Sequence, residues 1–391
     1  MAADPPSSIQ PRTGHVALPG VVALLAALGY VVIQLQVLAH GNAAWFVKAS
    51  QPYADPARVP RGLPVLSSYG YDGQFYYRLA LDPANLHHTA FGITLDLPFR
   101  LQRIGYPLLT WLLSLGQRSW VPVMLVAVNV LALGAIGLLG GMFAREAGRH
   151  VLWGLLLAGY FGFVLSLGND LTEPLAAACL LGGILAYRHR RPVLAGVLLA
   201  YGSLTRETIM VAAAAIALTR LIMLARRQAR PGRTDLTWLL PAVAFTGWQL
   251  VVHAAAGTYP VDADASSNVA RPVEAAFTAV RTNLGLLPHN IPADFWLLEL
   301  AILAVLAIAA ARSLRSTIAP VHERLAFLFF LTESALLSSS VWSGYADFRS
   351  LDELYLFAVV IILGSSFRRL EGMAALVAPA TILIAIYRTL G

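Results

Sequence analysis

Asp72 is the side chain best placed to remove a proton from a substrate. It lies in the segment SSYGYDGQFYYRLALDP (67–83), between Gly70 and Gly73, which permit a tight turn that presents the carboxylate. The following FYYRLAL predicts an amphipathic helix lying on a membrane surface, so Asp72 falls at a helix start. A carboxylate within hydrogen-bond reach of a hydroxyl can act as a general base. The structural alternative is that Asp72 only caps this helix, and the spacing leaves both interpretations open.

Arginines at three other places are candidates for binding phosphate. Arg103 closes the first long loop, after Asp96 and Arg100, and Arg349 lies in SSSVWSGYADFRSLDELY (338–355). Arg206 lies in SLTRET, at or below the membrane surface, where an ionisable group is costly and therefore a functional candidate. A guanidinium group binds phosphate through two parallel hydrogen bonds, so we expect Arg206, Arg349 and Arg103 to bind an anion.

Arg206 also has a purely structural interpretation. Glu173 lies in GNDLTEP and Glu207 follows Arg206 directly. An ion pair with either carboxylate would stabilise a helical bundle and do no chemistry.

Polar and aromatic side chains near these groups are candidates for binding a sugar, because sugar sites combine aromatic faces with carboxylates and amides. The expected set is Tyr71, Gln74, His88, Asp170, Glu173, Trp342 and Tyr345. The aromatic members can equally form the belt at the level of the lipid headgroups.

The sequence favours neither a metal nor another cofactor. His87 and His88 are adjacent and point to opposite sides in most backbones, and no H-x-E-x-H-type spacing is present. The single Cys179 excludes an internal disulfide and a cysteine cluster. Motifs for ATP hydrolysis, hydride transfer and a serine nucleophile are missing in a usable context.

The composition predicts a membrane protein. Of the 391 residues, 58% are hydrophobic and only 13% are charged, against about 25% charged residues in a soluble domain. The net charge of +7 does not indicate nucleic-acid binding, because Lys48 is the only lysine and the arginines lie in short clusters between apolar runs.

We expect an all-α fold, a polytopic transmembrane bundle of about eleven spans. The predicted spans are 16–39, 120–144, 151–168, 171–187, 192–204, 207–225, 236–257, 295–311, 324–343, 352–367 and 372–388.

The arginine distribution predicts the orientation of the spans. Fifteen arginines lie in five short connections, whereas the opposite short connections hold only Arg206 and Arg349. This asymmetry places the N-terminus in the cytoplasm and the C-terminus outside. We therefore expect a single transmembrane domain over 1–391 with two long outer loops, 40–104 and 258–294, and with interfacial helices in the first. The expected location is the plasma (inner) membrane.

This organisation resembles the membrane-embedded GT-C glycosyltransferases, which use polyprenyl-phosphate sugars. A cytoplasmic start, one span and a long first outer loop with an acidic residue are shared, and YDGQFYYRLALDP, RIGYPLLTWLLSLG and SLTRET resemble bacterial mannosyl- and arabinosyltransferases of this group. The resemblance implies that Asp72 is the catalytic base. This sequence departs from the acid-rich members, since it has no D-x-D pair at this point.

The resemblance implies an inverting glycosyltransferase with its active site outside the cytoplasm. Its partners are a polyprenyl-phosphate sugar donor, a glycan or glycolipid acceptor and membrane lipid, without nucleic acid. The main alternative is a transporter or flippase for a lipid-linked or small polar solute, and a third is a non-catalytic assembly or sensor protein. Against transport, the acids and arginines gather on one side, whereas alternating access needs a site near the membrane midplane.

Overall fold

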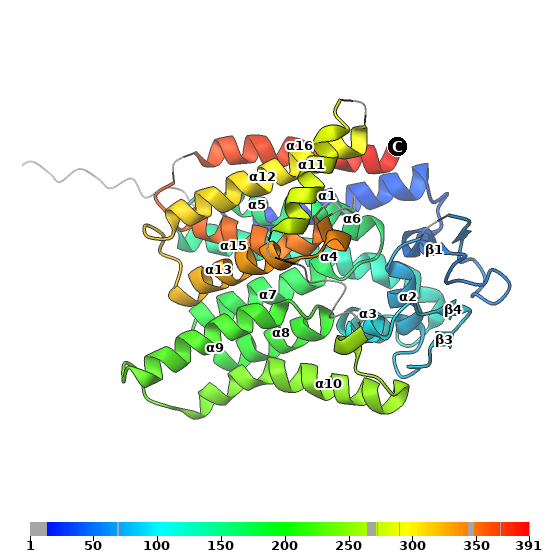
Figure 1. Cartoon of the computed structure of the whole chain (residues 1–391), viewed down its shortest axis with the longest axis horizontal. Coiled ribbons are helices and arrows are strands. Elements are labelled where there is room, and N and C mark those ends of the chain that lie inside the picture. The colour runs from blue at the N-terminus through cyan, green and yellow to red at the C-terminus, as the bar shows by residue number, and fades with distance from the viewer. Residues whose placement is uncertain are drawn as a thin grey trace, which may run out of the picture.

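The computed structural model describes residues 14–68, 70–263, 271, 273–288, 290–342, 348–367 and 369–390. The chain is helical, and its few strands are two residues long (Figure 1). The α-helices are α1 (Ala17–Val37), α2 (Gly73–Leu81), α3 (Gly105–Leu113), α4 (Val121–Glu146), α5 (Leu155–Ala158), α6 (Gly162–Gly168), α7 (Glu173–Arg188), α8 (Pro192–Thr205), α9 (Ile209–Ala225), α10 (Leu240–Ala256), α11 (Glu274–Gly285), α12 (Ile291–Ser313), α13 (Val321–Leu336), α14 (Ser339–Trp342), α15 (Asp352–Leu363) and α16 (Leu370–Leu390).

Short elements connect these helices. The 3₁₀ helices are η1 (Ala43–Val47), η2 (Pro98–Gln102), η3 (Arg118–Trp120), η4 (Val151–Gly154), η5 (Arg233–Leu239), η6 (Pro260–Ala263) and η7 (Arg349–Leu351). The strand β1 (Ala49–Ser50) pairs in parallel with β2 (Val65–Leu66), and β3 (Thr89–Ala90) pairs antiparallel with β4 (Ile93–Thr94).

All eleven predicted spans coincide with helices, but only some of these are long enough to cross a membrane alone. In the described part of the chain, five segments are long and apolar enough: Ala17–Val37, Arg118–Glu146, Arg233–Ala256, Ile291–Ser313 and Leu370–Leu390. A pair bent by 61°, Val151–Ala158 with Gly162–Gly168, would make a sixth. The other five predicted spans are α7, α8, α9, α13 and α15, of 12 to 17 residues. The structure thus has the helices of a multi-pass membrane protein, and the count of eleven stays a prediction.

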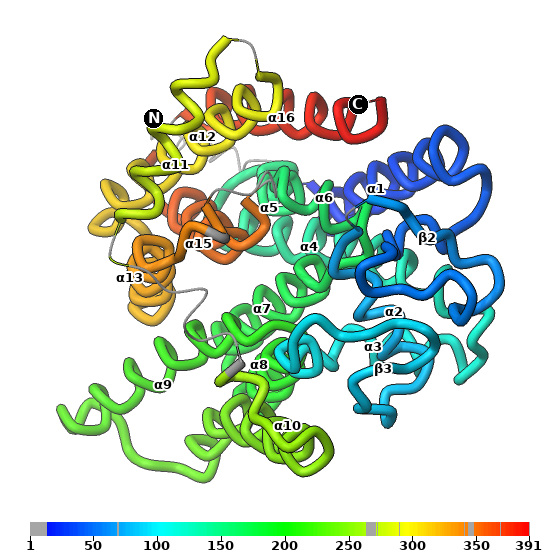
Figure 2. Tube along the Cα trace, turned by 45° about the vertical axis from the view of Figure 1, so that its right-hand side comes forward, coloured from blue at the N-terminus to red at the C-terminus, as the bar shows by residue number. Residues whose placement is uncertain are grey.

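The helices pack on both sides of α4. The first helix, α1, packs along α4, and α7 packs against α4 and α8, while α12, α13 and α15 pack together (Figure 2). Their apolar side chains form the larger of two hydrophobic clusters. The bundle therefore brings segments from both halves of the sequence together.

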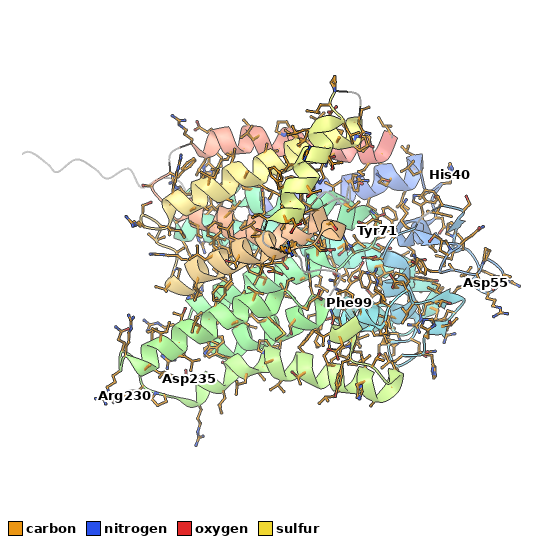
Figure 3. The ribbon with its side chains drawn as sticks, viewed as in Figure 1. His40, Asp55, Tyr71, Phe99, Arg230 and Asp235 are labelled. Atoms are coloured by element: carbon orange, nitrogen blue, oxygen red, sulfur yellow. The ribbon has the colours of Figure 1, made fainter. Side chains whose placement is uncertain are left out.

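Predicted cytoplasmic connections lie at one end of the bundle. Arg188 Nη1 lies 2.9 Å from Glu146 Oε2, and Arg149 Nη2 donates to the carbonyl of Ser365 over 2.7 Å. In Figure 3, Arg230 and Asp235 lie at the end opposite His40 and Tyr71. The helices thus separate the arginine-rich connections from the first long loop.

The helix predicted in the first long loop forms, but the prediction that it lies on a membrane surface is wrong. All nine residues of α2 are buried. They pack into the second hydrophobic cluster, which joins the loop to α4 through Leu125 and Val128. Helix α2 packs against α3, α4, η1, η2, β1 and β4, so both its polar and its apolar side chains are buried in protein. Helix α3 instead exposes Leu112 and Leu113 at its end.

Candidate functional site

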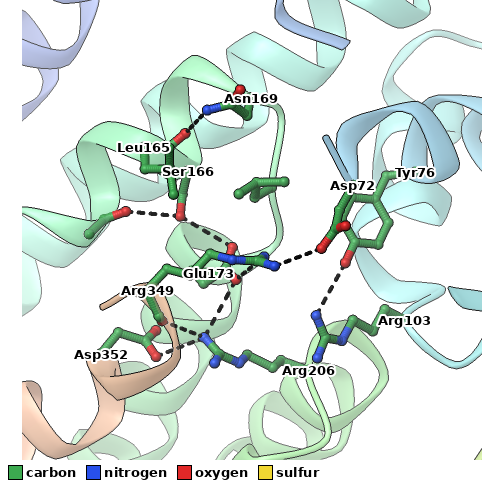
Figure 4. A network of polar contacts seen from close by, with 12 residues as sticks. Asp72, Tyr76, Arg103, Leu165, Ser166, Asn169, Glu173, Arg206, Arg349 and Asp352 are labelled. Carbon is green, nitrogen blue, oxygen red and sulfur yellow. Dashed lines mark hydrogen bonds and ion pairs between the residues drawn. The ribbon is translucent and has the colours of Figure 1, made fainter. Parts of the chain in front are cut away.

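Asp72 does not cap the helix that it precedes. It occupies the N-cap position of α2, yet its side chain makes no capping hydrogen bond. Instead, Asp72 Oδ2 accepts a hydrogen bond from Arg349 Nη2 at 2.7 Å (Figure 4). The same oxygen lies 3.0 Å from Arg100 Nη1. The carboxylate of Asp72 thus joins the start of α2 to Arg349 in the second half of the chain. The interpretation that Asp72 only caps the helix is therefore excluded.

Arg349 and Arg100 are fixed by their own partners. Arg349 Nη1 donates to Glu173 Oε1 over 3.0 Å, and its guanidinium lies 5.1 Å from the ring centre of Tyr71. Arg100 donates to both oxygens of Asp96, at 2.9 and 2.8 Å. Both side chains are about one-sixth exposed, 17% and 18%, so a ligand can reach them.

Arg103 forms a further ion pair, with Glu207. Its Nε and Nη2 donate to the two oxygens of Glu207 over 3.0 and 2.6 Å, and Nη1 donates to the hydroxyl of Tyr76 over 3.3 Å. We call Asp72, Asp96, Arg100, Arg103, Glu207 and Arg349 the outer tier. Its three arginines match its three carboxylates in formal charge.

Arg206 lies deeper, in what we call the inner tier with Glu173, Asp352 and Glu353. Its Nη1 donates to Asp352 Oδ1 over 2.8 Å and lies 3.7 Å from Glu173 Oε1, and its Nε lies 3.5 Å from Glu353 Oε1. Only 3% of the Arg206 side chain is exposed. The predicted pairing with Glu173 is therefore present, whereas Glu207 pairs with Arg103. Enclosed by three carboxylates, Arg206 offers little guanidinium surface to an anion.

The arginines keep Asp72 ionised. Burial by itself would raise the pKa of Asp72, but the guanidinium groups of Arg100, Arg349 and Arg103 outweigh it and hold the pKa well below its usual range. In this arrangement Asp72 is a weak base. Loss of these arginine contacts would raise the pKa of Asp72 and make it a stronger base.

The other predicted site residues divide into two groups. Tyr71 and Glu173 contact Arg349 directly. Gln74 is buried and accepts from the backbone N–H of Ser50 over 3.2 Å. His88 is exposed and directly precedes β3. The tiers thus contain only part of the predicted sugar-binding set.

Trp342 and Asp170 are buried in different surroundings. Trp342 packs edge-on against Phe348, with ring centres 5.7 Å apart, and its carbonyl accepts from Trp296 Nε1. Asp170 is fully buried, and neither of its carboxylate oxygens has a hydrogen-bond partner in the described part of the chain. Tyr345 lies outside the described residues.

Two features of the site escape sequence reasoning. Arg100 is expected from the sequence as an interfacial arginine able to bind phosphate, but its contact with Asp72 is not predicted. Asp352 and Glu353 flank Arg349 in sequence but pair with Arg206 in space. Across the described residues, no group of three or more His, Cys, Asp or Glu side chains is arranged to hold a metal ion.

The site thus combines a carboxylate, reachable arginines and an aromatic ring at one end of a helical bundle. No family model, curated protein or solved structure matches this chain.

Proposed function

We propose that this protein is an inverting glycosyltransferase that moves a sugar from a polyprenyl-phosphate donor to an acceptor hydroxyl outside the cytoplasm. The observation that carries the proposal is the pairing of Asp72 with Arg349 and Arg100. It sets a candidate general base and two candidate phosphate ligands within one hydrogen bond of each other, on side chains that a ligand can reach.

The outer tier has no net formal charge, because each arginine is matched by a carboxylate. A phosphate that binds these arginines must therefore displace a carboxylate from them. We propose that the donor phosphate takes the hydrogen bonds of Arg349 and Arg100 that Asp72 accepts at rest. Arg103 lies next to them, held by Glu207. Bidentate phosphate contacts are among the strong charge-assisted hydrogen bonds. Donor binding therefore frees Asp72 and raises its basicity.

In the proposed reaction, Asp72 accepts the proton of the acceptor hydroxyl. The acceptor oxygen forms a bond to the anomeric carbon from the face opposite the phosphate, and the bond between that carbon and the phosphate oxygen breaks. The bond's electron pair leaves on polyprenyl phosphate, whose charge Arg349 and Arg100 stabilise. Phosphate is a good leaving group, so no acid catalyst is needed.

We assign the inner tier a positioning role. Arg206 donates to the carbonyl of Arg349 over 3.2 Å as well as to Asp352, so it ties η7 to the start of α15. Glu173 then contacts Arg349 from α7. These contacts support a fixed position for the guanidinium of Arg349. We therefore propose a positioning role for Arg206 in place of the expected phosphate binding.

We further propose a GT-C-like arrangement in the plasma (inner) membrane, with an N-terminus in the cytoplasm. The gathering of Asp72, Arg349, Arg206 and Arg103 at the end opposite the arginine-rich connections supports this orientation. The acceptor is a glycan or glycolipid, and membrane lipid surrounds the apolar helix faces.

The transporter alternative is favoured by one observation, the buried charges around Arg206. A transporter would expose them alternately to both sides of the membrane, whereas a transferase opens to one side only. The deciding experiment incubates the protein in proteoliposomes with a panel of polyprenyl-phosphate sugars and cell-envelope glycans. A new glycosidic product supports the transferase. Movement of the labelled donor between leaflets without product supports transport.

A further inference from the structure

The first long loop contains a pocket that the proposed reaction does not use. Residues from two segments form it, 51–58 and 89–94, and it holds about 480 Å³. Pockets that bind small molecules commonly hold about 300–1,000 Å³, so its size suits a ligand. The polar and aromatic residues that line it are Gln51, Tyr53, Asp55, Arg58, Thr89 and Thr94. None of these residues belongs to the outer or the inner tier.

The backbone fixes the shape of this pocket. The N–H of Thr94 donates to the carbonyl of Tyr53 over 2.7 Å, and the N–H of Asp55 donates to the carbonyl of Gly92 over 2.8 Å. Gly92 has φ of 72°, and a Cβ on it would lie 2.6 Å from the carbonyl carbon of Arg58. Glycine is therefore required at this close approach. Because main-chain contacts join the two segments, loss of an exposed polar side chain should leave the pocket intact.

Packed side chains connect the pocket to Asp72. Tyr53 is half-buried and packs edge-on against Phe75 of α2, with ring centres 5.4 Å apart. The guanidinium of Arg100 lies 5.0 Å from the centre of the same Phe75 ring. Arg100 in turn pairs with Asp72. Three successive contacts thus lead from the wall of the pocket to the candidate base.

The formal charges of the pocket cancel. Arg58 Nε lies 3.3 Å from Asp55 Oδ2, and these two are the only charged residues among the described ones that line the pocket. Both side chains are exposed, so their ion pair is weak and can open to a ligand. A phosphate group is best held by an excess of positive charge, which this pocket does not offer. The lining therefore favours a neutral ligand.

The uncharged groups of the pocket match a saccharide. The hydroxyls of Thr89 and Thr94 lie 2.9 Å apart, and each can both donate and accept hydrogen bonds, as sugar hydroxyls do. The exposed amide of Gln51 adds further donors and an acceptor. Tyr53 supplies an aromatic ring against which the apolar face of a sugar can pack. His88, which the sequence placed among the sugar-binding candidates, directly precedes Thr89.

We propose that this pocket binds neutral saccharide units of the acceptor glycan, at a distance from the unit that receives the sugar. A glycan of several units can place one end at Asp72 and rest a later part of its chain on Tyr53. In Figure 3, Asp55 lies towards the same end of the molecule as Tyr71 and opposite Arg230. The pocket then gives longer acceptors a higher affinity than single sugars. The role in transfer rests on the proposed function, but the binding of a neutral glycan does not.

A binding experiment on the full-length protein in nanodiscs tests the pocket. The probes are linear hexasaccharides of mannose, arabinose and glucose, measured by calorimetry, and we expect the wild type to bind at least one of them. The double variant Gln51→Ala, Arg58→Ala removes two exposed side chains, so its affinity for that glycan should fall about tenfold or more. The matched control Arg61→Ala, at an exposed arginine of the same loop outside the pocket, should bind as the wild type does.

Absence of binding of all three hexasaccharides by the wild type, or an equal affinity in the wild type and the double variant, overturns the proposed pocket. The activity arm compares a hexasaccharide with a monosaccharide acceptor. The ratio of their kcat/KM values should be higher in the wild type and in Arg61→Ala than in the double variant. Equal ratios would overturn the acceptor role. Hexasaccharide binding that depends on the pocket, without transfer to any acceptor, would contradict only the proposed function.

Discussion

Arg349 and Asp72 lie 277 positions apart in the chain and are joined by a 2.7 Å hydrogen bond between Nη2 and Oδ2. The bond links the first long loop to η7, which directly precedes α15. In the proposed reaction, a donor phosphate replaces this contact. We therefore propose that Arg349 both holds the resting structure together and binds the anion.

Replacement of Arg349 by lysine should weaken donor binding. Lysine keeps the positive charge but lacks the planar fork that contacts Asp72 and Glu173 at the same time. Loss of one charge-assisted hydrogen bond, about 1.5–3 kcal/mol, corresponds to a roughly 10- to 150-fold weaker affinity. Binding of a fluorescent polyprenyl phosphate to proteoliposomes measures this. Arg118→Lys, at an exposed arginine that contacts Phe91, is the matched control and should bind as the wild type does.

Gly73→Ala should disturb the site although it adds only a methyl group. The new Cβ would lie 2.3 Å from the carbonyl oxygen of Asn169, so α2 or the neighbouring turn must move. We expect a loss of about 1–3 kcal/mol of stability together with a loss of transfer. Gly29→Ala meets no atom within 4 Å and lies inside α1, so thermal unfolding should show it equally or more stable. Equal melting temperatures for the two variants would contradict the close packing at Gly73.

Substitution of Arg188, at the arginine-rich end of the bundle, should lower the stability of the protein and leave sugar transfer unchanged. Arg188 donates to both oxygens of Glu323, whose side chain is fully buried, and also pairs with Glu146. Arg188→Ala leaves the Glu323 carboxylate buried and unpaired, which costs about 3–5 kcal/mol. Transfer per folded molecule should stay unchanged. The exposed neighbour Arg191→Ala should change neither quantity. A selective loss of transfer in Arg188→Ala would place part of the site at this end.

Asp72 should also leave a signature in the pH dependence of unfolding. Its pKa in the folded protein lies below the ordinary 3.8, because three arginines outweigh the effect of burial. The carboxylate therefore adds stability that is fully present above about pH 4 and is lost as the pH falls through the folded-state pKa. Thermal unfolding from pH 7 downwards should show wild type more stable than Asp72→Asn, with a gap that narrows below pH 4. A constant gap would mean that the arginines do not act on Asp72.

The sequence predicts the helices well because membrane-length apolar runs leave little choice of structure. Each predicted span falls on a helix, and the arginine-rich connections lie at one end, as Arg188 and Glu146 show. The sequence could not predict which segments lie side by side. Helix α2 is predicted as a surface helix, since its pattern is amphipathic, but the loop around it buries all nine residues.

For the candidate site, too, the sequence predicts residues but not which of them contact one another. Asp72, Arg349 and Arg206 are identifiable because polar groups are rare in this chain, but their partners come from tertiary packing. Arg206 is enclosed by Asp352 and Glu353, which lie close to Arg349 in the sequence. The structure therefore favours a supporting role for Arg206, and we propose that Arg100 joins Arg349 in binding the donor phosphate.

The central claim is that Asp72 is a base that donor phosphate frees from its arginines. The most direct test compares Asp72→Asn with Asp82→Asn, a carboxylate at the other end of α2, in donor binding and in transfer to glycan acceptors. Asparagine cannot accept the proton, so transfer should fall about 10²- to 10⁴-fold in Asp72→Asn. Donor binding should stay equal or become tighter, because no carboxylate competes for Arg349 and Arg100. Asp82→Asn should match the wild type in both. Transfer at the wild-type rate in Asp72→Asn, or a donor affinity that falls together with transfer, would contradict the account.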